Sequence, residues 1–106
     1  MAAQNLALKF SGENVNIGGV EYVAAPLPIG KMKLLSEAFA DGVSESELFE
    51  NMIFFIHASI ARNHPEVTTE MIEDELTIME ASDLFQRVIK MSGIDTSAEK
   101  KRTQSR

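Results

Sequence analysis

Two histidines are the side chains of this sequence whose type and spacing most suggest a metal site. His57 and His64 are seven residues apart, which is about two turns of a helix and would place both rings on one face. His64 precedes Pro65, however, where a helix is expected to end, and no carboxylate is clearly placed between the rings. We therefore expect His57 to border the core with a hydrogen bond and His64 to be exposed.

Acidic residues and serines are the other groups that could support catalysis. Glu73-Asp74-Glu75 could be read as a cation site or an acid–base pair, but consecutive helix residues point in different directions and no glycine-centred calcium loop is present. A solvated acidic face fits better. No base is placed to activate a serine hydroxyl, so we interpret four serines as helix caps or helix-surface residues: Ser36, Ser44, Ser46 and Ser59.

The absence of cysteine removes thiol chemistry from consideration. With no cysteine in the chain, there is no disulfide scaffold, thiolate metal site or cysteine nucleophile. Glycines never form a phosphate-binding loop. The sequence therefore predicts no catalytic, cofactor-binding or metal-binding residues, and we expect a protein that is not an enzyme.

Length and charge limit the size of the fold and the kind of partner. The 106 residues, 44% hydrophobic and 25% charged, are typical of one small domain, which we place at residues 1–94. The remainder, 95–106, is predicted to be a flexible, disordered basic tail, because it holds four basic and two acidic groups. The net charge of −6 thus becomes −8 without the tail, which disfavours nucleic acid and anionic membranes as partners.

Hydropathy gives no sign of export or membrane insertion. The first residues, MAAQNLALKF, lack a basic start followed by a long apolar core. No stretch approaches the roughly 20 apolar residues that cross a bilayer. We expect a cytoplasmic protein.

The segment NVNI-GG-VEYV predicts a β-hairpin at about residues 13–25. Val15 and Ile17 alternate with polar residues, and the Gly18-Gly19 pair suits the positive φ angles of a two-residue turn. Pro26 and Pro28 then end the second strand. A lone hairpin is marginal in water, so it must pack on another element.

Helical spacing recurs through the rest of the sequence. We expect a first helix at residues 31–42, a second at 47–63 behind a Ser44–Glu47 capping box, a third capped by Thr68 or Thr69, and a fourth capped by Ser82 and closed by Gly93. The third should face inward through Met71, Ile72, Leu76 and Met79. The predicted fold class is mainly α, with an N-terminal β-hairpin followed by a compact bundle of about four helices.

The second of these helices is apolar nearly all round. One arc of about 140° holds Leu48, Phe49, Met52, Ile53, Ile56 and Ile60. Phe54, Phe55 and Ala58 lie outside that arc, and a small fold has difficulty covering them, so another element or another molecule should do so. Thioether side chains also suit surfaces that repack around varied partners. The candidate partner-binding residues are Phe54, Phe55, Ala58 and Met52.

The order of these features resembles a known family. The hairpin VNIGGVEYVAAPL, the segment PLPIGKM, the turn and acidic helix RNHPEVTTEMIEDEL and a final helix ending in SG are similar to tail assembly chaperones of long-tailed bacteriophages and prophages. The resemblance covers about residues 13–94, and its positions are structural. The first dozen residues depart from the family pattern.

The resemblance implies a function as well as a fold. Such proteins bind the long helical tape measure protein, keep it soluble and deliver it while tail tube subunits assemble. The implied partners are the tape measure protein, the tail tube protein and further copies of the chain, in the host cytoplasm, with the chaperone absent from the mature virion. A longer frameshifted form is common in the family, and Lys100-Lys101 could be encoded by a slippery A-AAA-AAG run.

Two other interpretations stay open. The third and fourth helices could form a helix-turn-helix DNA-binding regulator, although the fourth offers only Arg87 and Lys90 and the third is strongly acidic. The chain could also be a generic phage structural or connector subunit.

Overall fold

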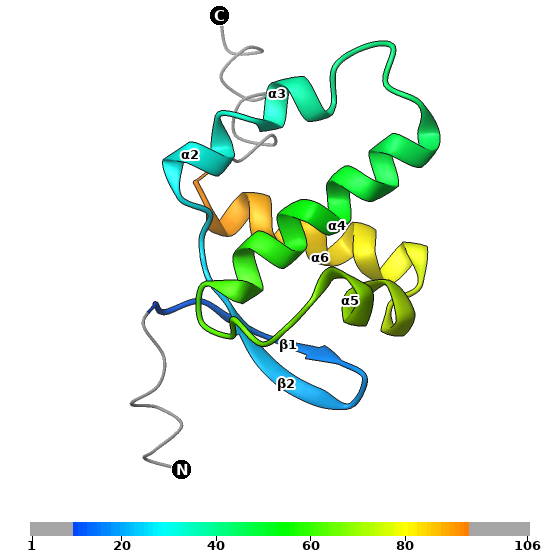
Figure 1. The fold of residues 1–106 in the computed structure, drawn as a ribbon. Coiled ribbons are helices and arrows are strands. Elements are labelled where there is room, and N and C mark those ends of the chain that lie inside the picture. Colours follow the sequence, from blue (N-terminus) through cyan, green and yellow to red (C-terminus); the bar gives the residue numbers. More distant parts are fainter. Residues whose placement is uncertain (1–9, 94–106) are drawn as a thin grey trace, which may run out of the picture.

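The computed structural model describes residues 10–93 and shows a β-hairpin followed by helices (Figure 1). The strands β1 (Glu13–Ile17) and β2 (Val20–Ala24) pair antiparallel, with Ile17 opposite Val20. The helices are α2 (Ile29–Met32), α3 (Leu35–Ala38), α4 (Glu45–Ala61), α5 (Thr69–Glu75) and α6 (Ile78–Met91). The predicted fold class, mainly α with an N-terminal hairpin, is confirmed. The predictions for the basic tail and the first nine residues lie outside the described residues.

The hairpin turn is the one that the glycine pair predicts. Gly18 and Gly19 have φ angles of 61° and 83°, a conformation that side chains with a Cβ atom rarely adopt and that matches the twist of paired strands. Val15 and Ile17 are buried. One face of the hairpin therefore packs on the helices, which provides the support that a two-stranded sheet needs to be stable.

The long helix α4 lies at the centre of the fold and crosses α6 (Figure 1). One cluster of buried side chains joins the hairpin to these helices, and its members include Val15, Ile17, Leu27, Ile56, Ile60, Val67, Ile72, Leu84 and Val88. Each such side chain contributes about 1.5–3 kcal/mol by leaving water. The described chain thus has a single core.

The buried face of α4 differs from the predicted arc. Ile56 and Ile60 are fully buried as expected, but Phe55, predicted to lie outside the arc, is only 1% exposed. Phe39, just after α3, and Phe85 of α6 approach its ring to centroid distances of 6.1 and 6.2 Å. Because these aromatic neighbours pack against Phe55, the buried side of α4 is centred closer to Phe55 than predicted. Phe49, Met52 and Ile53 are only half-buried.

Two helix starts follow the predicted caps. The Ser44 hydroxyl accepts the Glu47 N–H, while the Ser44 N–H donates to the Glu47 carboxylate at 3.0 Å, so the capping box is confirmed. Thr68 caps α5 by accepting the Met71 N–H. Both starts depend on local sequence, which is why they could be predicted.

The predicted start of the last helix is wrong. Ser82 lies inside α6, whose N-cap is Thr77, five residues earlier, in a capping box with Glu80. Met79, expected to face the core from the third helix, belongs instead to the first turn of α6 and is 82% exposed. The predicted first helix is also divided, into α2 and α3.

We call residues 23–27 the strap: this extended segment comprises the last two residues of β2 and the three that follow them towards α2. The Ala25 N–H donates to the Ser59 carbonyl at 3.1 Å, and the Ser59 hydroxyl donates back to the Ala25 carbonyl at 2.6 Å. Arg62 donates to the Pro26 carbonyl at 2.6 Å. Ser59 is fully buried, so its prediction as a cap or surface residue is wrong: its partner is strap backbone.

Both polar groups of Val23 are paired in the same way. The Val23 N–H donates to His64 Nε2 at 2.9 Å, and the Asn63 amide donates to the Val23 carbonyl at 3.2 Å. The His64 side chain is 18% exposed and meets Tyr22 edge to face. The expectation that His64 is exposed is wrong. Its ring nitrogen accepts the outward N–H of Val23, which in a wider sheet would bind a carbonyl of the next strand.

Candidate functional site

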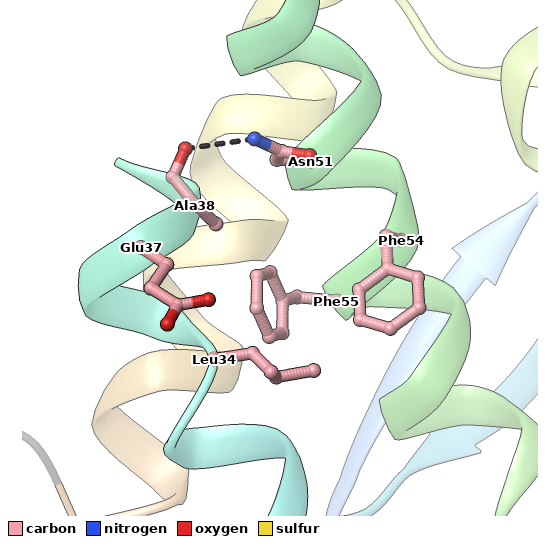
Figure 2. A pocket seen from close by; sticks show the side chains of 6 residues that line it. All are labelled: Leu34, Glu37, Ala38, Asn51, Phe54 and Phe55. Carbon is pink, nitrogen blue, oxygen red and sulfur yellow. Dashed lines mark hydrogen bonds between the residues drawn. The ribbon is translucent and has the colours of Figure 1, made fainter. Parts of the chain in front are cut away.

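An open groove of about 300 Å³ lies between α3 and α4 (Figure 2). Its lining comes from both helices and from the residue between α2 and α3: Leu34, Glu37, Ala38, Asn51, Phe54 and Phe55. This volume is at the lower end of the range for ligand pockets. The groove can hold one or two apolar side chains of another molecule.

A hydrogen bond holds the two walls in register. The Asn51 amide donates to the Ala38 carbonyl at 2.7 Å and thereby satisfies a carbonyl at the end of α3 that has no partner within the helix. Asn51 and the two phenylalanines lie on one side of α4, facing α3 (Figure 2). This hydrogen bond therefore links α3 to α4 at one end of the groove.

Two consecutive phenylalanines form the α4 side of the groove. Their rings meet edge to face, with centroids 5.0 Å apart and planes at 83°, which is a favoured aromatic arrangement. Neighbouring helix residues point about 100° apart, so Phe55 turns into the core while Phe54 stays 39% exposed. Phe55 supplies a buried base and Phe54 an exposed wall.

Charged groups flank this apolar lining unequally. Lys31 places its ammonium 5.2 Å from the centre of the Phe54 ring, within the range of a cation–π contact. Glu37, on the α3 wall, is exposed, and within residues 10–93 its carboxylate forms no ion pair or hydrogen bond. Within the described residues, the ammonium thus has an aromatic neighbour and the carboxylate has no charged or hydrogen-bonded partner.

The predicted partner-binding residues separate into two pairs. Phe54 and Phe55 both line the groove. Met52 and Ala58 are half-buried, packed against the core, and do not line it. Their role in binding a partner stays a prediction.

Sequence reasoning missed four of the lining residues: Leu34, Glu37, Ala38 and Asn51. Leu34 is 40% exposed, and it falls outside the stripe that Met32, Leu35 and Phe39 form at helical spacing. That offset was the available signal. No pattern in the sequence indicated that α3 would lie against Asn51.

Residues that could support chemistry are occupied by structural roles. His57 Nε2 lies 2.8 Å from the Val67 carbonyl, which confirms the predicted hydrogen bond. Within residues 10–93, no three or more His, Cys, Asp or Glu side chains gather as a metal site would require. Glu73, Asp74 and Glu75 are all exposed, as a solvated acidic face should be.

One carboxyl group has a perturbed acidity. Hydrogen bonds from Ser44, first from its backbone N–H and then from its side chain, lower the pKa of Glu47 below its ordinary value. The group is fully exposed and belongs to the capping box of α4. This shift therefore reports a helix start and not a reactive centre.

Comparisons with protein families, curated proteins and solved structures found no match to this chain. Among the described helices, none is long and apolar enough to span a bilayer. The family resemblance accordingly stays a prediction.

Proposed function

We propose that this chain is a non-enzymatic phage tail assembly chaperone that binds the tape measure protein through the groove, keeps it soluble and assists tail tube assembly. The observation that carries the proposal is Phe54, an aromatic ring 39% exposed beside an apolar groove. Exposed apolar surface of this kind marks interaction sites. Contacts with the tail tube protein and with further copies of the chain, in the host cytoplasm and not in the mature virion, belong to the same proposal.

The geometry of the groove supports binding of a polypeptide. Aromatic residues beside a pocket, surrounded by side chains that exclude water, are typical of the few positions that dominate binding energy at protein interfaces. Phe54 and Leu34 supply such exposed apolar surface on opposite walls. A long helical client that carries apolar stripes would offer many segments able to use the same groove.

The charge distribution supports a dispersing role. Residues 10–93 hold 14 acidic and five basic side chains, and a net charge far from zero keeps assemblies in solution. A complex of several such chains along a tape measure protein would inherit this repulsion. The acidic balance thus suits a protein that prevents aggregation.

The DNA-binding alternative has weaker support. Arg87, one of the two basic residues on α6, donates to the Glu13 carboxylate at 3.1 Å and to the Asn14 carbonyl at 3.2 Å. Its guanidinium is therefore committed to the hairpin. The affinity for duplex DNA depends on cations that are free to neutralise phosphates.

Co-expression with the tape measure protein tests the proposal. The native chain should raise the soluble yield of the tape measure protein, and Phe54→Ser should reduce that rescue severalfold. Met79→Ser is the matched control, because Met79 is exposed but lies on α6, outside the groove lining. A rescue that is absent, or equally sensitive to both substitutions, would contradict the proposal.

A low-salt binding assay with duplex DNA addresses the regulator. Tight, strongly salt-dependent binding by the full chain would favour a regulator over a chaperone. We expect none.

A further inference from the structure

The charge beside the groove identifies the kind of segment that it accepts. We infer that the groove takes an apolar side chain of a helical polypeptide that carries a lysine or arginine within one turn of that side chain. This inference rests on the proposed function and names the chemistry of the client segment. Three observations support it. They are the apolar lining, the Glu37 carboxylate, which has no partner within residues 10–93, and the Lys31 ammonium, which lies over the Phe54 ring.

The apolar lining requires an apolar anchor. Leu34 and Phe54 are 40% and 39% exposed on opposite walls, and Phe55 closes the space behind them. Ala38 leaves room that a larger side chain would fill. Burial of an aliphatic or aromatic group here removes apolar surface from water on both molecules, which favours binding.

Glu37 sets the charge of the group beside the anchor. Figure 2 shows its side chain on the α3 wall, among the residues that line the groove. A client that covers the groove removes water from this carboxylate, and desolvation without a partner is unfavourable. A lysine or arginine beside the anchor restores a charge-assisted hydrogen bond, whereas an acidic residue adds repulsion.

Lys31 confines this preference to the α3 side of the groove, because a cation–π contact leaves the charge of its ammonium in place. Its ammonium lies over the Phe54 ring on the other wall, 5.2 Å from the ring centre. The next basic residue, Lys33, is exposed and is not part of the lining. The excess of acidic groups over the described chain adds a long-range field that also favours cationic partners.

A second copy of this chain is the competing occupant. Ile29 is 77% exposed, and Lys33, four residues later, is exposed as well, so α2 presents the same apolar and basic pair. If α2 of one molecule filled the groove of another, the chain would associate head to tail. This outcome must be distinguished from client binding.

Three synthetic helical peptides provide the test with the full chain. They share one sequence with a single leucine anchor and differ only in the residue one turn away, which is Lys, Gln or Glu. By calorimetric titration at low salt, we expect the Lys peptide to bind about threefold tighter than the Gln peptide, and the Gln peptide tighter than the Glu peptide. Phe54→Ser should weaken all three.

Charge reversal at one residue then assigns the preference. Glu37→Lys should invert the order of the Lys and Glu peptides, and Glu37→Gln should abolish it. Glu45→Lys serves as the matched control, since Glu45 is exposed at the start of α4 and does not line the groove. It should preserve the order.

Each other outcome overturns the inference in a recognisable way. Equal binding of the three peptides, or an order that ignores Glu37, removes the charge preference, while rescue of the tape measure protein by the native chain would leave the proposed function intact. Self-association that Ile29→Ser abolishes, and that blocks the peptides, would assign the groove to a second copy. A correct peptide order without any rescue would instead contradict the proposed function alone.

Discussion

The two halves of α4 differ in how their surfaces are used. Towards its C-terminal end, polar side chains of the helix and of the turn after it bind the backbone of the strap. Before that end, from Asn51 to Phe55 near its middle, the helix faces α3 across an open groove. We call the C-terminal part and the turn after it the closed half; its polar groups Ser59 and Asn63 are buried. We call the part that faces α3 the open half; its Phe54 ring is exposed. Polarity along this helix therefore does not indicate which side faces water.

The difference follows from what covers each half. The strap brings unpaired N–H and C=O groups to the helix, and such groups must be satisfied when they leave water. The short helix α3 brings side chains to the groove, together with the terminal carbonyl of Ala38, which Asn51 binds. The closed half is thus a stability element, and the open half is available for binding.

Phe55→Ala should have the largest effect on folding. Its ring is 1% exposed and packs against Phe39 and Phe85, so its removal should lower the free energy of unfolding by about 3–5 kcal/mol. Chemical denaturation followed by circular dichroism measures this change. A loss below about 1 kcal/mol would show that the base of the groove is not core.

Asn63→Ala should show how much the closed half contributes. The substitution leaves the N–H and C=O of Phe10 and the carbonyl of Val23 without their amide partner, at a cost of about 1–3 kcal/mol. Asn51→Ala, which removes the amide that spans the open half, is the matched comparison. Equal losses at the two positions would contradict the distinction between the halves.

Ser44→Ala should destabilise the start of α4 by about 1 kcal/mol at neutral pH. The lowered pKa of Glu47 means that its contribution is present above the ordinary pKa of a carboxyl group and is lost as the pH falls through the folded-state value. Because the N–H of residue 44 remains in Ser44→Ala, the pH-dependent part is tested with Glu47→Gln, whose loss of stability relative to the native chain should shrink in acid. Thermal unfolding at neutral and acidic pH measures it, and a difference that grows in acid would oppose this account.

Phe54→Ser should have the smallest effect on stability, within about 0.5–1 kcal/mol, because the ring is partly exposed and makes its main contacts with Phe55 and Lys31. Its effect should appear in binding. A variant that unfolds like Phe55→Ala would make both rings core residues and would remove the main support for a binding surface.

Local signals explain what the sequence could predict. The hairpin turn needs two residues with positive φ, and the capping boxes need an interaction between residues three apart, so the Gly18-Gly19 pair and the Ser44–Glu47 pair were sufficient. The predicted start of α6 at Ser82 is wrong, although the true signal, the capping box of Thr77 and Glu80, is equally local.

The remaining features depend on residues far apart in the sequence. Ser59 and His64 bind backbone groups 34 and 41 residues before them, and no pattern around either residue reveals this. Phe54 and Phe55 both lay outside the predicted arc, and only the positions of Phe39 and Phe85 decide which ring is buried. The groove could therefore be expected on α4, but its second wall could not.

The strap also donates a hydrogen bond to the far end of the fold: its Leu27 N–H binds the Ser92 hydroxyl at 2.7 Å, across 65 residues. During synthesis on the ribosome, the early part of the chain is made well before this acceptor exists. Contacts of such long sequence separation form late and slow folding. This contact of the strap cannot form before α6 has been made, because Ser92 directly follows that helix.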